Sequence, residues 1–414
     1  MSTMKERVLE LEAKGCFDFF WNEANQDPNS PGYGLIVDTT KKPHIASIAS
    51  NGFGLAALVI GVERGYVSFK DAYERALGTL KTFRDRVCHV NGFYPHFLNM
   101  KTAERHKLSE FSTIDTAILL MGALVAGEFF GREVKEVAEE LLNRTKWDWL
   151  VTDYRGKPVF RMSYEPERYP DREGWAPPLW DLYAEHLMMY FLAAGQEGFD
   201  PELALKLYFG FERRVGAYRS GPLVYCFGGA LFTYQYSHAF IDFREIVDAR
   251  GFDWFNNSVQ ATIANRNWCI DHMDRFKTYN EYAWGLTASS SKNGYKIFGA
   301  APFGWDRIDY EPPQDGTIMP CGPAGSIPFL PDECIASLNY FYDHHPQLWG
   351  EYGFKDAYNL DVDPAWYADH YIGIDKGITL LMIDNYQHGT VWHYVMNSEY
   401  MKRSLAVLHF KKKK

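Results

Sequence analysis

Hydrophobic positions recur along this chain mainly at the three- and four-residue spacing of amphipathic helices. Typical start signals support this reading: Ser68 precedes FKDAYERAL, Ser112 and Asp115 form a capping-box pattern, and Pro201 opens ELALKLYFG. Strand-like segments are few, at 157–164 and 222–227. The spacing predicts helices at roughly 4–25, 45–64, 68–87, 113–130, 133–149, 181–194, 201–210, 232–247, 254–275, 331–344, 375–387 and 391–403.

Long connections separate these helices, and no internal repeat or low-complexity linker divides the chain. Loops of this length inside a compact protein usually carry function. About twelve helices with such loops predict an all-α protein, one domain over 1–414, in which inner and outer helices close into a ring. The longest connections, rich in Gly, Pro and aromatic residues, are 27–44, 88–111, 164–180, 213–231 and 285–330.

Aromatic residues are abundant, with 12 Trp, 27 Tyr and 29 Phe making 16% of the chain. Their flat apolar faces suit a large helical core and also the C–H faces of sugar rings. The net charge is −10, and the only basic cluster is the terminal KKKK. Nucleic-acid binding needs clustered cations, so a nucleic-acid partner is excluded and a neutral polyol is favoured.

The six cysteines are scattered, without a CxxC spacing, which predicts free buried thiols in a reducing compartment. The opening MSTMKERVLELEAKG lacks the apolar core of a signal peptide. The longest apolar run, at 117–127, is too short to cross a bilayer. We therefore expect a cytoplasmic monomer without a membrane partner, exported only if a leader preceded this sequence.

The sequence contains no convincing signature of a cofactor-binding or metal-binding site. NGFGLA fits a dinucleotide-binding string, but it lies inside a helical pattern and follows no strand. His238 and Asp242, four residues apart, could form a pair of metal ligands, but no third ligand is near, so a hydrogen-bonded pair is favoured. We predict no metal and no cofactor.

Three carboxylate residues stand out because each lies in or at the start of a predicted apolar helix. Asp115 lies in the first turn of 113–130 and faces inward; the alternative is a capping acid with no other role. Glu185 is predicted in the middle of 181–194, where burial would raise its pKa as a general acid requires; the alternative is a structural Glu paired with Arg. Asp375 starts the helix 375–387, where backbone N–H groups would keep it ionised; the alternative is a cap.

Polar side chains interspersed with aromatic residues, as in LFTYQYSHAFIDFRE (231–245) and ANRNWC (264–269), are typical of a sugar site. Rings stack on sugar faces while amide, guanidinium and carboxylate groups reach the hydroxyls. Residues in these strings and near the three carboxylates are the predicted substrate contacts: His96, Trp180, Tyr236, His238, Asp242, Arg266 and Tyr386.

Nine strings occur in one order between about residues 16 and 396: NGFYPHFLN, LSEFSTIDTAILLMG, YAEHLMMYFLAAG, LFTYQYSHAFIDFR, NNSVQATIANRNWCID, WGLTAS, IPFLPDEC, YGFKDAYN and IGIDKGITLLMIDNYQHGTVW. Together they resemble the "putative glucoamylase" domain group, and within it glycoside hydrolase family 144. The resemblance implies an (α/α)6 barrel and a β-1,2-glucan substrate, cleaved internally or by release of the disaccharide sophorose. The older glucoamylase label, which implies α-1,4 cleavage, does not fit this pattern.

The resemblance places the essential acids at Asp115 and Glu185, with Asp375 as a further candidate. Inverting hydrolysis is then expected, with Glu185 as the acid and Asp115 or Asp375 activating water. Two alternatives stay open: a transglycosylase related to cyclic β-1,2-glucan synthases, and a non-catalytic glucan-binding toroid. The chain departs from the family in GIDKG, where GIDQG is common, and in DNYQHG, where Gln387 replaces an Arg.

Overall fold

The computed structural model describes residues 6–300 and 313–413, and its secondary structure is dominated by helices. The helices in chain order are α1 (Arg7–Asn22), α2 (Ile48–Glu63), α3 (Phe69–Asp85), α4 (Thr113–Phe130), α5 (Arg132–Arg144), α6 (Leu187–Gly195), α7 (Pro201–Tyr208), α8 (Phe232–Phe240), α9 (Trp254–Asp271), α10 (Cys321–Gly325), α11 (Pro331–His344), α12 (Gly373–Gln387), α13 (Thr390–Asn397) and α14 (Glu399–Val407).

Each predicted helix has a counterpart, so the all-α prediction is confirmed. The predicted helix 391–403 is divided into α13 and α14, and the short α10, with the sequence CGPAG, was not predicted. Residues 4–5 of the first predicted helix, and 301–312 within the long 285–330 connection, lie outside the described residues.

The strands are short, and every sheet in the described part of the chain has two strands. They are β1 (Ile45–Ser47), β2 (Phe97–Asn99), β3 (Phe111–Ser112), β4 (Val151–Tyr154), β5 (Lys157–Phe160), β6 (Ser163–Tyr164), β7 (Val215–Gly216), β8 (Leu223–Val224), β9 (Ile246–Val247), β10 (Ala288–Ser291), β11 (Gly294–Ile297), β12 (Trp349–Gly350), β13 (Gly353–Phe354), β14 (Tyr358–Asn359), β15 (Trp366–Tyr367) and β16 (Lys411–Lys412). The predicted strand segment 157–164 contains β5 and β6, which belong to different sheets, and the segment 222–227 contains β8.

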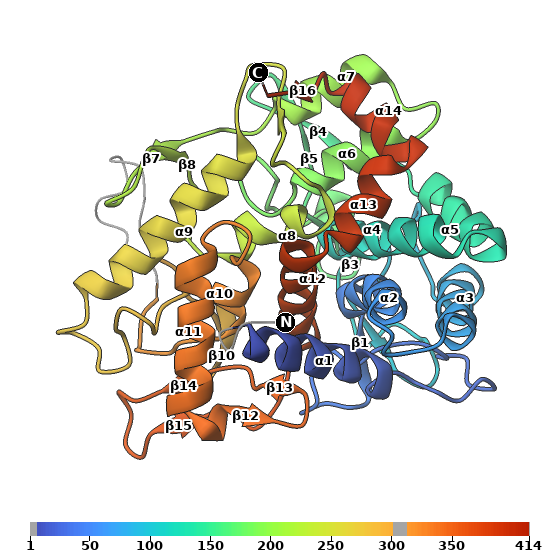
Figure 1. Cartoon of the computed structure of the whole chain (residues 1–414). Helices are drawn as coiled ribbons and strands as arrows, with labels where there is room; N and C mark the ends of the chain where they lie inside the picture. The colour runs from blue at the N-terminus through green and yellow to red at the C-terminus, as the bar shows by residue number, and fades with distance from the viewer. Residues whose placement is uncertain (1–5, 301–312, 414) are drawn as a thin grey trace.

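The helices form an inner and an outer set. Helix α12 packs against α2, α8 and α10, and α4 packs against α2 and α6. The other long helices lie outside these: α1 on α2 and α12, α3 on α2, α5 on α4, α9 on α8, and α11 on α10. Figure 1 shows α12 near the middle of the molecule, with α3, α5 and α9 towards the outside.

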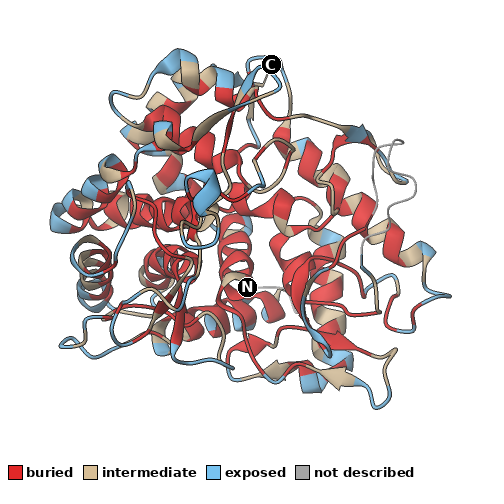
Figure 2. Cartoon of the chain, turned by 180° about the vertical axis from the view of Figure 1, so that it is seen from behind, coloured by how far each residue is buried: buried red, intermediate tan, exposed pale blue. Residues whose placement is uncertain are grey.

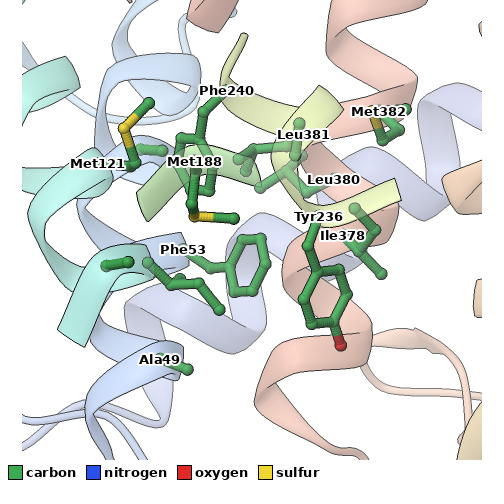
Figure 3. Close-up of a cluster of buried hydrophobic side chains, with 14 of the residues drawn as sticks. Ala49, Phe53, Met121, Met188, Tyr236, Phe240, Ile378, Leu380, Leu381 and Met382 are labelled. Atoms are coloured by element: carbon green, nitrogen blue, oxygen red, sulfur yellow. The ribbon is translucent and has the colours of Figure 1, made fainter. Parts of the chain in front are cut away.

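The core lies between the inner helices. Phe53 of α2, Tyr236 and Phe240 of α8, Met121 of α4 and Met188 of α6 meet in one buried cluster (Figure 3). In Figure 2 the inner helices are almost entirely buried, whereas exposed residues concentrate on the outer helices and loops. The inner helices are therefore buried on nearly all sides, as helices surrounded by others are.

Close packing of α2 on α4 explains the NGFGLA string. A Cβ atom on Gly52 would lie 2.3 Å from the carbonyl oxygen of Ile118, and one on Gly122 would lie 2.0 Å from the carbonyl oxygen of Gly52. Only glycine permits this approach of two helix backbones. Gly52 therefore serves helix packing, as expected from its place inside a helical pattern.

Helix α4 is long and apolar enough to cross a membrane by length and composition, but 78% of it is buried inside the fold. That burial is typical of the core helix of a globular fold. The high hydropathy of α4 is explained by its place in the core.

Candidate active site

The entry segments of three inner helices are tied together at one end of the molecule. Isolated β-bridges join Val37 to Ala46 before α2, Thr39 to Ile372 before α12, and Pro95 to Phe111 before α4. The strand pairs β1–β2 and β3–β6 reinforce these links. The first turns of α2, α4 and α12, and the side chains they carry, are therefore held close to one another.

Asp115 lies in the first turn of α4, at the entrance to this end. Its N–H donates to Ser112 Oγ at 3.2 Å, and the Ser112 hydroxyl donates to Asp115 Oδ2 at 2.5 Å. The Ser112 N–H is already bonded to the carbonyl oxygen of Tyr94. Ser112 therefore caps the helix, while the Asp115 carboxylate completes no capping box and is available for another role.

His96 connects Asp115 to Glu110. Its Nδ1 lies 2.7 Å from Glu110 Oε1, and its Nε2 lies 3.7 Å from Asp115 Oδ1. Burial lowers the pKa of His96, but the charge of Asp115 and the bond to Glu110 outweigh it and raise the pKa to about 9. The predicted contact residue His96 is therefore a cation at neutral pH, beside Asp115.

Glu185 precedes α6, so the prediction of a mid-helix position is wrong. The backbone of Asp181 and Tyr183 bonds to Glu212 instead of forming a helical turn, and α6 begins only at Leu187. Ser237 of α8 then fixes the turn by donating to the Glu185 carbonyl oxygen at 2.7 Å.

The pKa of Glu185 is raised to about 7, first by burial and then by the negative charge of Asp115, against a backbone hydrogen bond that lowers it. The predicted direction is confirmed. Among the described residues, no lysine or arginine forms an ion pair with Glu185. A carboxyl group that stays protonated near neutral pH is suited to general-acid catalysis.

Asp375 lies in the first turn of α12 and is 6% exposed; Asp356, which is 5% exposed, lines the same small cavity. Burial, the charge of Asp356 and a hydrogen bond to Asp356 raise the pKa of Asp375 well above its usual range. The expectation that backbone N–H groups would keep Asp375 ionised is therefore wrong, because a neighbouring carboxyl group and desolvation outweigh the helix terminus.

Further groups join this site that the sequence did not predict. The carbonyl oxygen of Asp38 accepts the N–H of Gly373, which places Asp38 beside the start of α12. Its pKa is raised by burial and by the charges of Asp115 and Asp356, against the lowering effect of His96. No spacing signal marks Asp38 or Asp356, since each follows an irregular segment.

Two tyrosines complete the site. Tyr236 of α8 is buried, and burial, followed by the negative charge of Asp375, raises the pKa of its phenol well above the usual range. Figure 3 shows its hydroxyl pointing away from the apolar cluster. Tyr295, on β11, is 52% exposed and lies near Asp375 and Asp356. Tyr236 therefore lies near both Asp375 and Glu185.

Two predicted contact residues belong to the core. Trp180 donates from Nε1 to Thr113 Oγ1 at 3.0 Å and stacks on His186, so it supports the start of α4. His238 is buried against Ser258 Oγ at 3.0 Å, and burial lowers its pKa to about 3.

Three other predicted contacts lie away from the carboxylates. Asp242 follows α8 and pairs with Arg244 at 2.8 Å. Arg266 lies on the outer helix α9. Tyr386 lies in the last turn of α12, at the opposite end from Asp375, and lines a groove with residues of α1 and α11. The structure does not bring these three side chains to the site.

No three or more His, Cys, Asp or Glu side chains within residues 6–300 and 313–413 are grouped as metal ligands. All six cysteines are free thiols; four are buried, Cys226 is half-buried and Cys88 is exposed. The prediction of burial is therefore wrong for Cys88.

A protein-family model described as "Putative glucoamylase" matches residues 178–399. The chain belongs to this family. It is 25% identical to an exo β-1,2-glucooligosaccharide sophorohydrolase (non-reducing end) of Parabacteroides distasonis, over 95% of this chain and 56% of the relative. This chain thus spans little more than half the length of that relative.

Solved structures of similar fold cover the whole chain. A family member from Bacteroides uniformis, described as a putative glucoamylase, is 28% identical with a TM-score of 0.84, covering 100% of this chain and 99% of that one. An endo-β-1,2-glucanase of Chitinophaga pinensis, solved with sophorotriose and glucose, is 24% identical with a TM-score of 0.83, covering 99% of both chains. The second likeness concerns the fold alone.

Proposed function

We propose that this chain is a glycoside hydrolase that cleaves β-1,2-linked glucose oligosaccharides, and that it corresponds to glycoside hydrolase family 144. The observation that carries the chemistry is Glu185, a carboxyl group with a pKa raised to about 7 that shares a site with further carboxylates. The name of the Parabacteroides relative supports the β-1,2 linkage over the α-1,4 linkage that the word glucoamylase implies.

We propose that the fold is an (α/α)6 barrel and a single domain over 1–414. In this reading α2, α4, α6, α8, α10 and α12 are the inner helices. The contacts of α12 with α2, α8 and α10, and of α4 with α2 and α6, support such a ring. The carboxylates then lie at the end where the inner helices begin.

Glu185 acts as the general acid and Asp375 as the general base in the proposed mechanism. Asp115 is the weaker candidate for the base, because Ser112 donates to one of its oxygens and the cationic His96 faces the other. Its negative charge instead keeps Glu185 protonated. In its ionised form, Asp375 is a stronger base than an ordinary carboxylate because its pKa is raised, which favours Asp375 over Asp115 as the base.

Inversion is the expected outcome. Glu185 protonates the glycosidic oxygen while a water molecule, deprotonated by Asp375, attacks the anomeric carbon from the opposite face. The aromatic rings of Tyr236 and Tyr295 border the site where the sugar would bind.

A substrate panel tests the proposal. Purified protein is incubated with linear β-1,2-glucan and, in parallel, with α-1,4-linked glucan, and new reducing ends are counted. We expect release from the β-1,2 substrate alone and a loss of about 10²- to 10⁴-fold in Glu185→Gln. The control Glu212→Gln changes a residue that pairs with Arg155 and Arg214 and should retain the parental rate.

The same panel separates the two alternatives. Longer products from added sophorose would favour a transglycosylase, and glucan binding without new reducing ends would favour a non-catalytic toroid. The proposal includes a monomeric protein that acts on oligosaccharides in the cytoplasm. The six free thiols support the reducing compartment.

A further inference from the structure

His96 is held in one orientation at the entrance to the site. Its Nδ1 lies 2.7 Å from Glu110 Oε1, and its backbone N–H donates to the Glu110 carbonyl oxygen at 2.8 Å. The ring of Phe97 stacks on the imidazole, with 3.8 Å between the ring centroids and 15° between the ring planes. The carbonyl oxygen of His96 accepts the N–H of Ile48, the first residue of α2. The second ring nitrogen, Nε2, therefore points in a fixed direction.

Asp115 faces that nitrogen. Its Oδ1 lies 3.7 Å from His96 Nε2, while the Ser112 hydroxyl holds its Oδ2 at 2.5 Å. A separation of 3.7 Å is too long for a direct hydrogen bond, but it allows one further oxygen atom to bond both groups. The side chains of His96 and Asp115 are 27% and 15% exposed, so a bound molecule can reach both of them.

The two groups offer complementary bonds to a ligand. Burial lowers the pKa of His96, but the charge of Asp115 and the bond to Glu110 raise it to about 9, so both ring nitrogens carry a hydrogen at neutral pH. Asp115, whose negative charge acts on His96, accepts hydrogen through its oxygens. A hydroxyl group accepts one bond and donates another, whereas an ammonium group has no acceptor for His96 and an anion would be repelled by the carboxylates. The pair is therefore complementary to a neutral polyol.

We propose that His96 and Asp115 form a hydroxyl clamp for the substrate, in which His96 Nε2 donates to the oxygen of one glucose hydroxyl group and Asp115 Oδ1 accepts the hydrogen of that same group. Glu110 is a positioning residue, which acts through His96 and does not contact the sugar. This inference rests on the proposed function and adds a group of the substrate that the site selects. The charge of Asp115 also acts on Glu185, so the clamp lies near the proposed acid.

A binding cycle between protein and sugar tests the clamp, because water offers the same hydroxyl chemistry as the sugar. Sophorotriose and its monodeoxy analogues, each lacking one hydroxyl group, are titrated by calorimetry into Glu185→Gln, which should bind them without turnover. One analogue should bind about 10-fold or more weakly than sophorotriose, because hydrogen bonds to charged groups are lost. Adding His96→Gln should weaken sophorotriose by a similar factor and abolish its advantage over that analogue, since the effects of interacting partners are not additive.

The outcomes of this cycle separate the clamp from a bridging water. If His96→Gln weakens sophorotriose and every analogue by the same factor, or weakens none of them, the clamp is overturned. If no sugar binds to Glu185→Gln, the proposed function is overturned together with the clamp. Should His96→Gln not fold, Asp115→Ala completes the same cycle from the acceptor side.

His393 provides a matched control for the histidine substitution. It is an exposed residue of α13 and lines a cavity with Arg64, at the end of the fold away from the carboxylates. His393→Gln in the Glu185→Gln background should keep the affinity for sophorotriose and for each analogue. A loss equal to that of His96→Gln would show that the effect is not specific to the clamp and would overturn it.

The pH dependence of binding gives a readout that a purely structural role of His96 would not move. The titratable groups that face His96 are Asp115, Glu110 and Asp38. When His96 loses one proton, its remaining hydrogen stays on Nδ1 towards Glu110, so Nε2 no longer donates. The affinity of Glu185→Gln for sophorotriose should therefore fall as the pH rises through about 9. An affinity that stays constant through this range would overturn the clamp.

The role of Glu110 is tested without any substrate, so that its failure differs from failure of the proposed function. Glu110→Gln keeps a hydrogen-bond acceptor for His96 Nδ1 but removes a negative charge that raises the pKa of His96. In an NMR titration of the His96 ring, the midpoint should lie near pH 9 in the parent and clearly lower in Glu110→Gln. The fall in sugar affinity should move to lower pH by the same amount. An unchanged midpoint would overturn the assignment of Glu110 as the positioning residue.

Discussion

Two buried aspartates on α12 differ in what neutralises them. Asp384, towards the end of the helix, is fully buried and bonds Arg64 Nε at 2.8 Å, while Arg64 also reaches Gln387 at 2.8 Å. Asp375, in the first turn, faces another carboxyl group instead of a cation. Both are carboxylates on one apolar helix, and burial alone does not separate them.

The difference shows how the molecule distributes structural and chemical roles. An aspartate paired with a buried guanidinium is held in place, and removing one partner of such a pair leaves an uncompensated buried charge, which destabilises the fold. An aspartate next to a carboxyl group can exchange a proton at an ordinary pH. Gln387, which replaces the arginine common in the family, belongs to the structural end of α12. It bonds Arg64 and Glu10, far from Asp375.

Replacing Asp375 should have the largest effect on activity and little effect on stability. Asp375→Asn removes the proposed base, so kcat should fall by about 10²- to 10⁴-fold. The melting temperature should stay level or rise, because an uncharged amide replaces one of two neighbouring buried carboxyl groups. Reducing-end assays and thermal unfolding measure the two quantities, and a strong loss of stability with retained activity would reverse the comparison.

Replacing Asp384 should do the opposite. Asp384→Asn leaves Arg64 buried without its main counter-charge, which costs about 3–5 kcal/mol in the free energy of unfolding. The kcat measured below the melting temperature should be retained. Arg64→Met combined with Asp384→Leu should recover part of the stability, since no charge is then left unpaired; denaturant unfolding of all three variants gives the values.

The pH dependence should follow Glu185. Its acid form is needed for catalysis, so kcat/KM should fall about tenfold per pH unit above the pKa of about 7. The folded-state pKa is raised above the unfolded value of about 4.3, so ionising Glu185 destabilises the fold as pH rises from there through 7. Glu185→Gln should therefore gain in melting temperature relative to the parent between pH 5 and pH 8, and an unchanged difference would contradict the raised pKa.

Gln387→Arg should have the smallest effect. The position lies at the Arg64 end of α12, where a second arginine can reach Glu10, so activity should not change and stability should shift by no more than about 0.5 kcal/mol. A changed affinity for oligosaccharide would show that this end of the helix binds sugar.

The sequence predicted the helices well because their periodicity reflects the layer in which each one packs. It misplaced the start of α6, because the bonds of Asp181 and Tyr183 with Glu212 are long-range and outweigh the local helical pattern. It also missed α10, whose Gly and Pro residues oppose a helix in isolation.

Part of the candidate site could be predicted from the sequence. The pattern indicated that Asp115 and Asp375 lie at helix starts, and that the pKa of Glu185 is raised. The presence of Asp38 and Asp356 at the site could not be predicted. Both lie in irregular loops, which are placed by backbone pairing with residues distant in the sequence. The prediction that His238 and Tyr386 contact the substrate was wrong for a related reason. A polar residue among aromatic ones is equally typical of a hydrogen-bonded core position or of a groove on another face.

The measurement that tests the account most directly follows the anomeric configuration of the first products. Purified protein acting on linear β-1,2-glucan is monitored by proton NMR before the anomers equilibrate. The account predicts that the newly formed reducing end appears first as the α-anomer, and that Glu185→Gln forms none. A β-anomer formed first would contradict inversion by Glu185 and Asp375, and an absence of any new reducing end from the parent would contradict the proposed hydrolysis itself.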